Sequence, residues 1–324
     1  MSYIDVFNGD ADGICALHQL RLDKPRPEAR LVTGVKRDIR LLTKIQEVRN
    51  TDITVLDISL DRNRDALEKL IGQQNTIFYA DHHFSGRVPE SGNLQPHIDT
   101  SPQTCTSLIV DALLQGRYRA WAVAGAFGDN LDEMAIHTAS KLGFDEAAIE
   151  KLKETGILLN YNGYGASLED LYCPPDDLYR QVQPFEDPLD FHANSPILET
   201  LRQGYGRDMQ RAREFTPSRE SVHGRIYSFP AESWARRVVG VYSNKLVREK
   251  PDMSHGLIIP NSDGTLRISV RASLNNRIGA DELCREFPSG GGRAAAAGIN
   301  NLPPEQLERF HSAFFSRFNL DASG

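Results

Sequence analysis

The feature that most constrains the fold is an alternation of short apolar strands with helical segments in the first part of the chain. Three apolar segments have the length and composition of strands: Tyr3–Phe7, Ile53–Asp57 and Thr76–Ala80. Segments with helical spacing lie between or after them: Ile14–Leu22, Leu41–Val48 and Arg64–Leu70. Because strands separated by helices form right-handed crossover units, this order predicts an α/β domain with a parallel sheet. Further helices are expected at Thr104–Leu114, Ala120–Phe127 and Asp145–Lys153.

Acidic and imidazole side chains stand where each predicted strand ends: Asp10, Asp12, Asp57, Asp81, His82 and His83. The carboxyl ends of parallel strands meet at one edge of a sheet, so we expect these side chains to lie close together. Gathered carboxylates repel one another strongly unless cations lie between them. Oxygen ligands with an imidazole suit divalent ions such as Mn²⁺ or Mg²⁺. The sequence therefore predicts a divalent metal site at this edge.

Each of these motifs, taken alone, has a second interpretation. Asn8–Gly13 matches the start of an EF-hand calcium loop, although its twelfth position is Gln19 and a strand is predicted before it; a plain polar turn is the other alternative. Asp57 could be a helix N-cap, and the pair His82-His83 could be incidental surface. The segment Gly128–Asn130, with Asp129, follows an apolar helix and is typical of a helix stop and the N-cap of the next helix. Their convergence, rather than any one motif, favours the metal site.

The second half of the chain has a smaller α+β pattern. Strands are expected at Val222–Tyr227, Gly256–Ile259 and Leu266–Val270, and helices at Ala280–Glu286 and Pro304–Phe318. The run Gly290–Gly292 is typical of a flexible connector or of a turn whose backbone N–H groups approach a phosphate closely. We place the domains at residues 1–185 and 216–324, joined by a largely helical linker over residues 186–215.

Composition excludes several classes of protein. The formal net charge of −7 argues against a broad duplex-DNA surface, because such surfaces are usually basic. We see neither a signal peptide nor an apolar run of membrane-spanning length. Four widely spaced cysteines with no CxxC pair fit reduced thiols and argue against a zinc knuckle. We therefore expect a cytoplasmic protein with no membrane partner.

The motifs together resemble those of the DHH phosphoesterase superfamily: Asp10-Ala-Asp12-Gly13, Asp57, Asp81-His82-His83 and Gly125–Asp129. That superfamily includes RecJ-like exonucleases, nanoRNases, cyclic-dinucleotide phosphodiesterases and family II pyrophosphatases. In the second half, Ile268–Ser273, Gly290–Gly292 and Ala296–Gly298 are similar to the DHH-associated domain. The resemblance covers nearly the whole chain. It implies a parallel-sheet DHH domain with a second, smaller α+β DHH-associated domain across a cleft.

The resemblance also implies a centre of two Mn²⁺ ions, with Mg²⁺ as the alternative. The side chains that would hold the ions are Asp10, Asp12, Asp57, His82 and Asp129. Asp57 would bridge both ions, with Asp10 on one ion and the remaining ligands on the other. His83 would face the scissile phosphate, and Asp81 would orient its neighbours. The substrate-binding residues would be Arg271, Ser273, Gly290, Gly291, Gly292 and Arg293.

Two positions depart from the family pattern. The first motif usually begins with a histidine four or two residues before the first aspartate, where this chain has Val6 and Asn8. Only Asn8 could contribute a ligand, through its carbonyl oxygen, so the first ion would be completed by Asn8, water or substrate. The family's GGGH signature here ends in Arg293. Arginine binds phosphate but cannot transfer protons as histidine does.

These observations predict a divergent member that hydrolyses short single-stranded oligonucleotides or dinucleotides to nucleoside monophosphates with a metal-activated water. No basic tract or further nucleic-acid-binding module points to long substrates. The first alternative is a phosphomonoesterase or anhydride hydrolase acting on a 3′-phosphonucleotide or polyphosphate. The second is a non-catalytic nucleotide sensor, which Val6, Asn8 and Arg293 favour. The resemblance allows a homodimer, but the sequence shows no interface signature.

Overall fold

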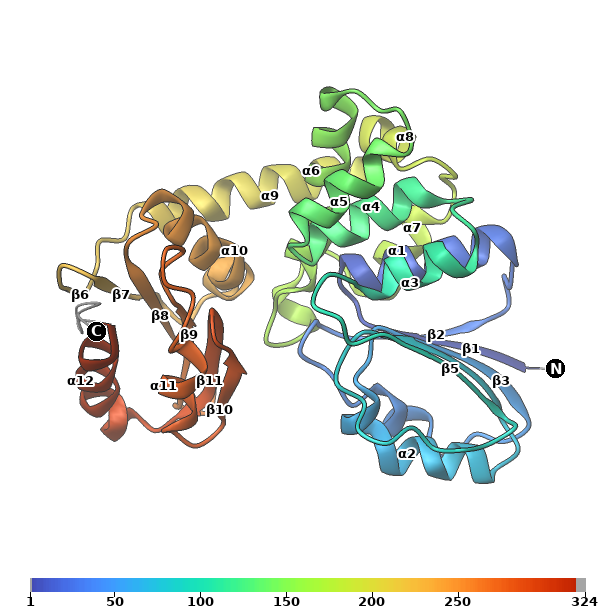
Figure 1. Cartoon of the computed structure of the whole chain (residues 1–324), viewed down its shortest axis with the longest axis horizontal. Helices are drawn as coiled ribbons and strands as arrows, with labels where there is room; N and C mark the ends of the chain where they lie inside the picture. The colour runs from blue at the N-terminus through green and yellow to red at the C-terminus, as the bar shows by residue number, and fades with distance from the viewer. Residues whose placement is uncertain (1, 319–324) are drawn as a thin grey trace. The chain divides into compact units, whose positions relative to one another are not determined.

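The structure is a computed structural model of the chain and describes residues 2–318 (Figure 1). It divides into two compact units, Met1–Gly204 and Tyr205–Gly324. The division falls within helix α9 (Pro196–Arg213), inside the segment that we assign to a helical linker. Each unit is described by itself.

The first unit is built on a parallel sheet. Its strands are β1 (Ser2–Phe7), β2 (Arg30–Val32), β3 (Thr51–Leu56), β4 (Thr76–Asp81) and β5 (Leu94–Ile98). They pair in the order β2-β1-β3-β4-β5, and every pair is parallel. The three central strands are those that the sequence predicts. The edge strands β2 and β5 were not predicted, because one is very short and the other contains Pro96, which only an edge strand accommodates easily.

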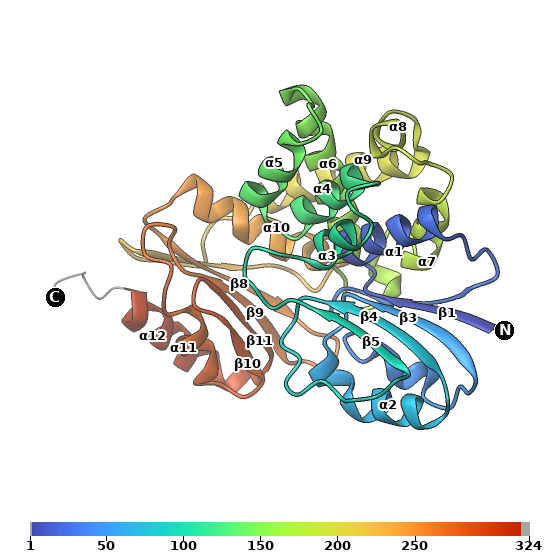
Figure 2. The same ribbon diagram turned by 45° about the vertical axis from the view of Figure 1, so that its right-hand side comes forward.

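Helices cover both faces of this sheet (Figures 1 and 2). One face carries α2 (Leu60–Gly72) and the short 3₁₀ helix η1 (Leu41–Ile45), where the sequence predicts a longer helix. Alternate strand residues such as Val6 and Val55 pack there against Leu67 in one apolar core. The other face carries α1 (Ala11–Asp23) and α3 (Thr106–Leu113), and α4 (Arg119–Gly128) packs on these two helices.

Further helices complete the helical layer of the first unit. They are α5 (Asp132–Ser140), α6 (Glu146–Gly163), the 3₁₀ helix η2 (Leu168–Asp170), α7 (Pro175–Val182) and α8 (Pro188–Asn194). Helix α6 continues to Gly163, well past the predicted end at Lys153. Because α6 is long, its C-terminus comes close to the N-terminus of α1, where Gly163 packs on Asp10.

The second unit is a mixed sheet with helices on both faces (Figure 2). The strands are β6 (Arg219–Glu220), β7 (Gly224–Ser228), β8 (Ser254–Pro260), β9 (Leu266–Arg271), β10 (Gly290–Arg293) and β11 (Ala296–Leu302). They pair in the order β10-β11-β9-β8-β7-β6, with β7 and β8 parallel and the other pairs antiparallel. Helices α11 (Ala280–Arg285) and α12 (Leu307–Phe318) share one core with the sheet, and the short 3₁₀ helix η3 (Pro304–Gln306) precedes α12. Helix α10 (Ser233–Glu249) packs on β8 and β9.

This architecture confirms the predicted fold class: an α/β unit with a parallel sheet and a second unit of α+β type. In the second unit, a local expectation was wrong. The glycines of Gly290–Gly292 form the edge strand β10, paired with β11, rather than a loop. None of the helices in residues 2–318 is long and apolar enough to cross a membrane.

Candidate metal centre

The loop between β1 and α1 fixes the first two carboxylates. Asp10 is the N-cap of α1, and its Oδ1 accepts a hydrogen bond of 3.1 Å from the N–H of Gly13. A Cβ at Gly13 would lie 2.2 Å from the carbonyl oxygen of Asn8, so a glycine is required for this tight turn. Asp12 follows in the first turn of the helix. The strand before this loop is β1, which removes the helix–loop–helix context of an EF-hand.

Asp12 is held by the start of helix α3. Its Oδ2 accepts from the N–H of Thr106 at 2.8 Å, and its Oδ1 accepts from the N–H of Ser107 at 2.7 Å. Backbone N–H groups at a helix N-terminus are natural partners for a carboxylate. Asp12 is therefore oriented before any ligand binds.

Asp57 stands directly after β3 in an uncommon backbone conformation. Its φ is +58°, a left-handed value that aspartate adopts rarely. Its N–H donates to the carbonyl oxygen of Ala80, and its side chain is 2% exposed and accepts from the hydroxyl of Thr106 at 3.3 Å. Ser59, not Asp57, is the N-cap of α2, so the N-cap alternative for Asp57 was wrong. A buried, left-handed aspartate is typical of a functional position.

His82 lies at the centre of the acidic group. Its Nε2 is 3.4 Å from Asp57 Oδ1 and 3.8 Å from Asp129 Oδ2. The same nitrogen is 4.0 Å from Asp12 Oδ2. The imidazole thus faces carboxylates from three separate parts of the chain, and its side chain is only 7% exposed. This is the geometry expected of side chains that share one cation.

Asp81 and His83 form a pair beside this group. Asp81 ends β4 and is fully buried, and its Oδ1 lies 2.7 Å from Nδ1 of His83. The side chain of His83 is 40% exposed, so its second ring nitrogen remains accessible. Burial alone would lower the pKa of His83, but the hydrogen bond and charge of Asp81 raise it above its ordinary value. Asp81 therefore orients His83 and favours its protonated form.

Asp129 reaches the group from the end of helix α4. It is the C-cap residue of that helix, and its N–H donates to the carbonyl oxygen of Gly125 at 3.0 Å. The interpretation as a helix stop was therefore right, whereas the N-cap of the next helix, α5, is Leu131. The same residue also lies next to His82, so a capping position and a place in the acidic group are compatible.

Lys36 also belongs to this group, and the sequence analysis missed it. Its ammonium lies 2.5 Å from Asp10 Oδ2, 3.1 Å from Asn160 Oδ1 and 3.5 Å from Asp129 Oδ1. The ring of Tyr164 lies 5.7 Å from the same nitrogen. Nothing in the local sequence around Lys36 marks it, because the loop after β2 and the end of α6 bring these residues together only in the fold.

The electrostatics show that the acidic group needs positive charge. Burial raises the pKa of Asp57 well above its ordinary value, and the charges of Asp10, Asp12 and Asp129 raise it further. Burial would also raise the pKa of Asp10, but the ammonium of Lys36 lowers it below its ordinary value. Lys36 thus compensates Asp10, whereas Asp57 keeps a raised pKa. A divalent cation near Asp57 would remove this penalty.

The donor set fits a divalent cation. Ligand atoms of Asp57, His82 and His83 lie within 4.8 Å of one another. Within the part of the chain that the structure describes, Asn8 Oδ1 and Asp81 Oδ2 are buried and have no hydrogen-bond partner. Carboxylate and amide oxygens with an imidazole suit Mn²⁺ or Mg²⁺. The predicted metal residues of the first unit are therefore brought together, and the orphaned oxygen of Asn8 suits its predicted role.

The residues predicted to bind substrate lie in the second unit. Arg271 ends β9, where its Nε donates to Asn244 Oδ1 at 2.8 Å. The register pairs Arg293 with Ala296 and Ala296 with Arg271, so both arginines stand in one row across three strands. Ser273 is buried in a local turn, where its Oγ accepts from the N–H of Asn276 at 3.1 Å. The register thus puts the two arginines on one face of the sheet, on strands that β11 separates, and Ser273 is held in a turn.

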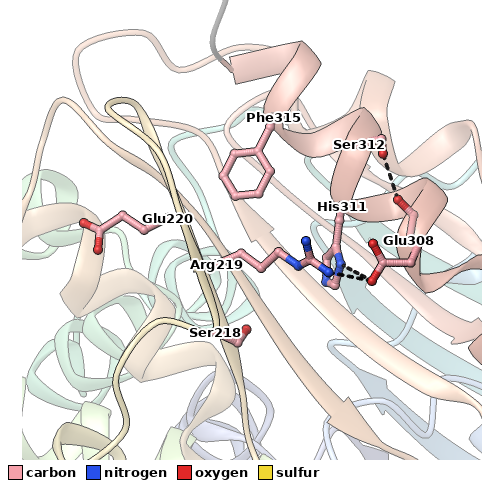
Figure 3. A pocket seen from close by; sticks show the side chains of 7 residues that line it. All are labelled: Ser218, Arg219, Glu220, Glu308, His311, Ser312 and Phe315. Atoms are coloured by element: carbon pink, nitrogen blue, oxygen red, sulfur yellow. Dashed lines mark hydrogen bonds and ion pairs between the residues drawn. The ribbon is translucent and has the colours of Figure 1, made fainter.

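A separate hollow of about 400 Å³ lies on the second unit, lined by Ser218, Arg219, Glu220, Glu308, His311, Ser312 and Phe315 (Figure 3). Oε1 of Glu308 lies 2.7 Å from Arg219 Nη2 and 3.3 Å from His311 Nδ1. Because the carboxylate of Glu308 already compensates the charge of Arg219, we assign no phosphate site to this hollow.

Comparison with known proteins identifies solved structures with a similar fold. No family model and no curated protein matches the sequence. Among solved structures, exonuclease RecJ bound to manganese aligns with 98% of this chain and 90% of its own, at a TM-score of 0.64 and 15% identity. RecJ from Thermus thermophilus in complex with Mn²⁺ aligns with 98% of this chain at a TM-score of 0.61 and 15% identity. The alignment covers 52% of that RecJ, so this chain spans about half of its length.

A third similar structure matches end to end. The pGpG-specific phosphodiesterase PggH from Vibrio cholerae aligns with 99% of this chain and 100% of its own length, at a TM-score of 0.55 and 13% identity. The resemblance drawn from the motifs is thus confirmed at the level of the fold. The chain has the fold that these RecJ and PggH structures share.

Proposed function

We propose that this chain is a metal-dependent phosphodiesterase that hydrolyses short single-stranded oligonucleotides or dinucleotides to nucleoside monophosphates. The observation that carries the proposal is the convergence of Asp12, Asp57 and Asp129 on Nε2 of His82. A divalent cation held there would supply a Lewis acid for the phosphate and a lower pKa for the attacking water. The manganese in the RecJ structures supports Mn²⁺, with Mg²⁺ as the alternative.

The chain's own residues have distinct roles in this proposal. The ligands are Asp12, Asp57, His82 and Asp129, with Asp10 and Asn8 beside them. Asp81 holds His83 through Nδ1, which leaves Nε2 of His83 to face a phosphate oxygen. There the imidazole can donate a proton or a hydrogen bond as negative charge develops.

We assign phosphate recognition to the second unit. The register, which puts Arg271 and Arg293 on one face of the sheet, supports this assignment, because guanidinium binds phosphate through paired hydrogen bonds. Strand β10 is an edge strand, and the N–H of Gly290 already donates to the carbonyl oxygen of Phe287 at 3.1 Å, so Gly291 and Gly292 are the glycines that could offer a backbone N–H to a phosphate. Ser273 fixes the turn that follows Arg271. These residues form our proposed substrate-binding set.

Two observations support a short substrate. The net charge is −7, which disfavours an extended interface with a nucleic-acid backbone. PggH, whose name specifies the dinucleotide pGpG, matches this fold along both whole chains.

A substrate panel tests the proposal. It contains RNA and DNA of two to five nucleotides, pGpG, a cyclic dinucleotide, a 3′-phosphonucleotide and polyphosphate, each with Mn²⁺ and resolved by chromatography. We expect mononucleotides from the shortest linear substrates and no turnover after chelation. The variant Asp57→Asn should lose more than about a hundredfold in rate. The control Asp61→Asn, which alters an exposed aspartate on α2, should keep full activity.

The other outcomes separate the alternatives. Release of inorganic phosphate alone would indicate a monoesterase or anhydride hydrolase. Tight nucleotide binding without any turnover, from folded and Mn²⁺-loaded protein, would indicate a sensor. Full activity in Asp57→Asn would contradict the assignment of the metal centre.

A further inference from the structure

We propose that Lys36 takes the place of one of the two cations, so that this centre binds a single divalent ion. The inference rests on the metal centre of the proposed function and concerns its composition. It starts from the position of the Lys36 ammonium, which lies between carboxylates of the same acidic group that would hold the ions.

The acidic group divides into two halves, one around the imidazole of His82 and one around the ammonium of Lys36. Around His82, the oxygens of Asp12, Asp57 and Asp129 lie 3.4–4.0 Å from Nε2. On the other side, Asp10 points its Oδ2 at Lys36. Asp129 lies between the halves, since Oδ2 is near His82 and Oδ1 is near Lys36. The first half suits a divalent ion, whereas the second already contains a fixed positive charge.

Lys36 is anchored as a structural part of the site. Its backbone N–H donates to the carbonyl oxygen of Gly163 at 2.9 Å. Its ammonium donates to Asn160 Oδ1 at 3.1 Å, and Asn160 Nδ2 in turn donates to the hydroxyl of Tyr164 at 3.2 Å. The ring of Tyr164 adds a cation–π contact. These partners come from the C-terminus of α6, the end of a helix that favours a cation.

The first-motif substitutions agree with this arrangement. Val6 is buried in the apolar core and offers no ligand, and Asn8 offers only a neutral oxygen. A second divalent ion next to Asp10 would therefore have few charged ligands and would have to displace an ammonium. Lys36 supplies one positive charge there without any exchangeable ion.

Counting bound ions tests the inference. Equilibrium dialysis with Mn²⁺ and metal analysis should give one ion per wild-type chain at saturation. Lys36→Met removes the ammonium but keeps a side chain of similar length, and it should bind two. Electron paramagnetic resonance should then show coupling between two Mn²⁺ ions in Lys36→Met and none in the wild type. The control Lys44→Met removes a lysine that pairs with Asp38 outside the site and should bind one ion.

Two aspartate variants sharpen the result. Asp10→Asn should change the affinity for the single ion by less than about threefold, because Asp10 pairs with the ammonium of Lys36 rather than with the ion. Asp57→Asn should lower the affinity for the ion by about tenfold or more. Equal losses in both variants would contradict the division of the site.

The outcomes distinguish this inference from the proposed function. Two ions in the wild type, or one ion in both wild type and Lys36→Met, would overturn the role of Lys36 and leave the metal centre intact. No bound ion in the wild type would overturn the metal centre itself. If Lys36→Met does not fold, Lys36→Gln, which also removes the charge, takes its place, and two ions in the wild type overturn the role of Lys36 without any variant.

Discussion

His18 shows how burial makes one side chain sensitive to pH. It is 1% exposed, its Nε2–H donates to the carbonyl oxygen of Phe185 at 2.7 Å, and its ring packs edge-on against Trp121. Burial lowers the pKa of His18 from 6.5 to about 4, although the hydrogen bond to Phe185 opposes the shift. The folded state therefore resists protonation of this ring.

The sign of the effect on stability follows from that shift. A histidine whose pKa is lowered in the folded state contributes stability above its unfolded pKa and loses it as the pH falls. Between pH 7 and pH 4, His18 should account for a loss of about 3 kcal/mol in the free energy of unfolding. We expect urea titrations of His18→Gln to show a smaller loss over this range than the wild type. The control His137→Gln, at an exposed position on α5, should show the same pH dependence of the free energy of unfolding as the wild type. The prediction is contradicted if His18→Gln also loses as much stability between pH 7 and pH 4 as the wild type.

Single residues also show how far the sequence predicts the site. The residues Asp10, Asp12, Asp57, Asp81 and His82 follow strands whose pattern is visible in the sequence, and parallel pairing forces their ends together. Lys36 has no such signal, because its partners come from a loop and from the far end of α6. Local patterns indicate residues tied to element ends. They do not indicate residues whose place depends on how distant elements pack.

At the scale of elements, close packing of α4 on α6 carries Asp129 into the site. A Cβ at Gly156 would lie 2.1 Å from the carbonyl oxygen of Ala124, and a Cβ at Gly128 would lie 2.3 Å from Cβ of Ala11. Small residues therefore let α4 approach its neighbours at the turn before Asp129. In the segment Gly125–Asp129 the glycines allow close helix packing, and Asp129 contributes its carboxylate to the acidic group around His82.

We expect Gly156→Ala to push α4 away from α6 and to destabilise the first unit by about 1–3 kcal/mol, as overpacking does. Asp129 moves with the end of α4, so Mn²⁺ affinity should fall as well, by about tenfold. Thermal unfolding and Mn²⁺ titration would measure the two effects. The control is Gly72→Ala. Gly72 is the last residue of α2, and an added Cβ there would meet open space, so the free energy of unfolding should change by less than about 0.5 kcal/mol. Unchanged Mn²⁺ affinity in a destabilised Gly156→Ala would mean that α4 does not position Asp129.

Elements differ in how well local sequence predicts them. The central strands have apolar runs bounded by polar turns, and the sequence predicts them closely. Strand β10 consists largely of glycines, which have low strand propensity, and only its pairing with β11 makes it a strand. Helix α10 was missed although Trp234, Val238 and Tyr242 have helical spacing and are buried. The helical spacing of α10 was visible in the sequence, whereas nothing in the sequence indicated that β10 would pair with β11.

At the scale of the whole molecule, the metal centre lies entirely in the first unit. An ion that binds only the folded state stabilises the unit that holds it by about 2.7 kcal/mol at a concentration of about 100 Kd. For a unit of this size, that corresponds to a rise in Tm of about 5–10 °C. We therefore expect added Mn²⁺ to raise the unfolding temperature of the first unit and a chelator to reverse the rise.

The chain's tryptophans allow each unit to be followed separately. Its two tryptophans are Trp121, buried in α4 of the first unit, and Trp234, in α10 of the second. Fluorescence melts of Trp234→Phe report on Trp121 alone, and melts of Trp121→Phe report on Trp234 alone. Mn²⁺ should shift the Trp121 signal, and Asp57→Asn in the same background should abolish that shift. A shift confined to Trp234 would place the ion in the second unit and contradict the centre around His82.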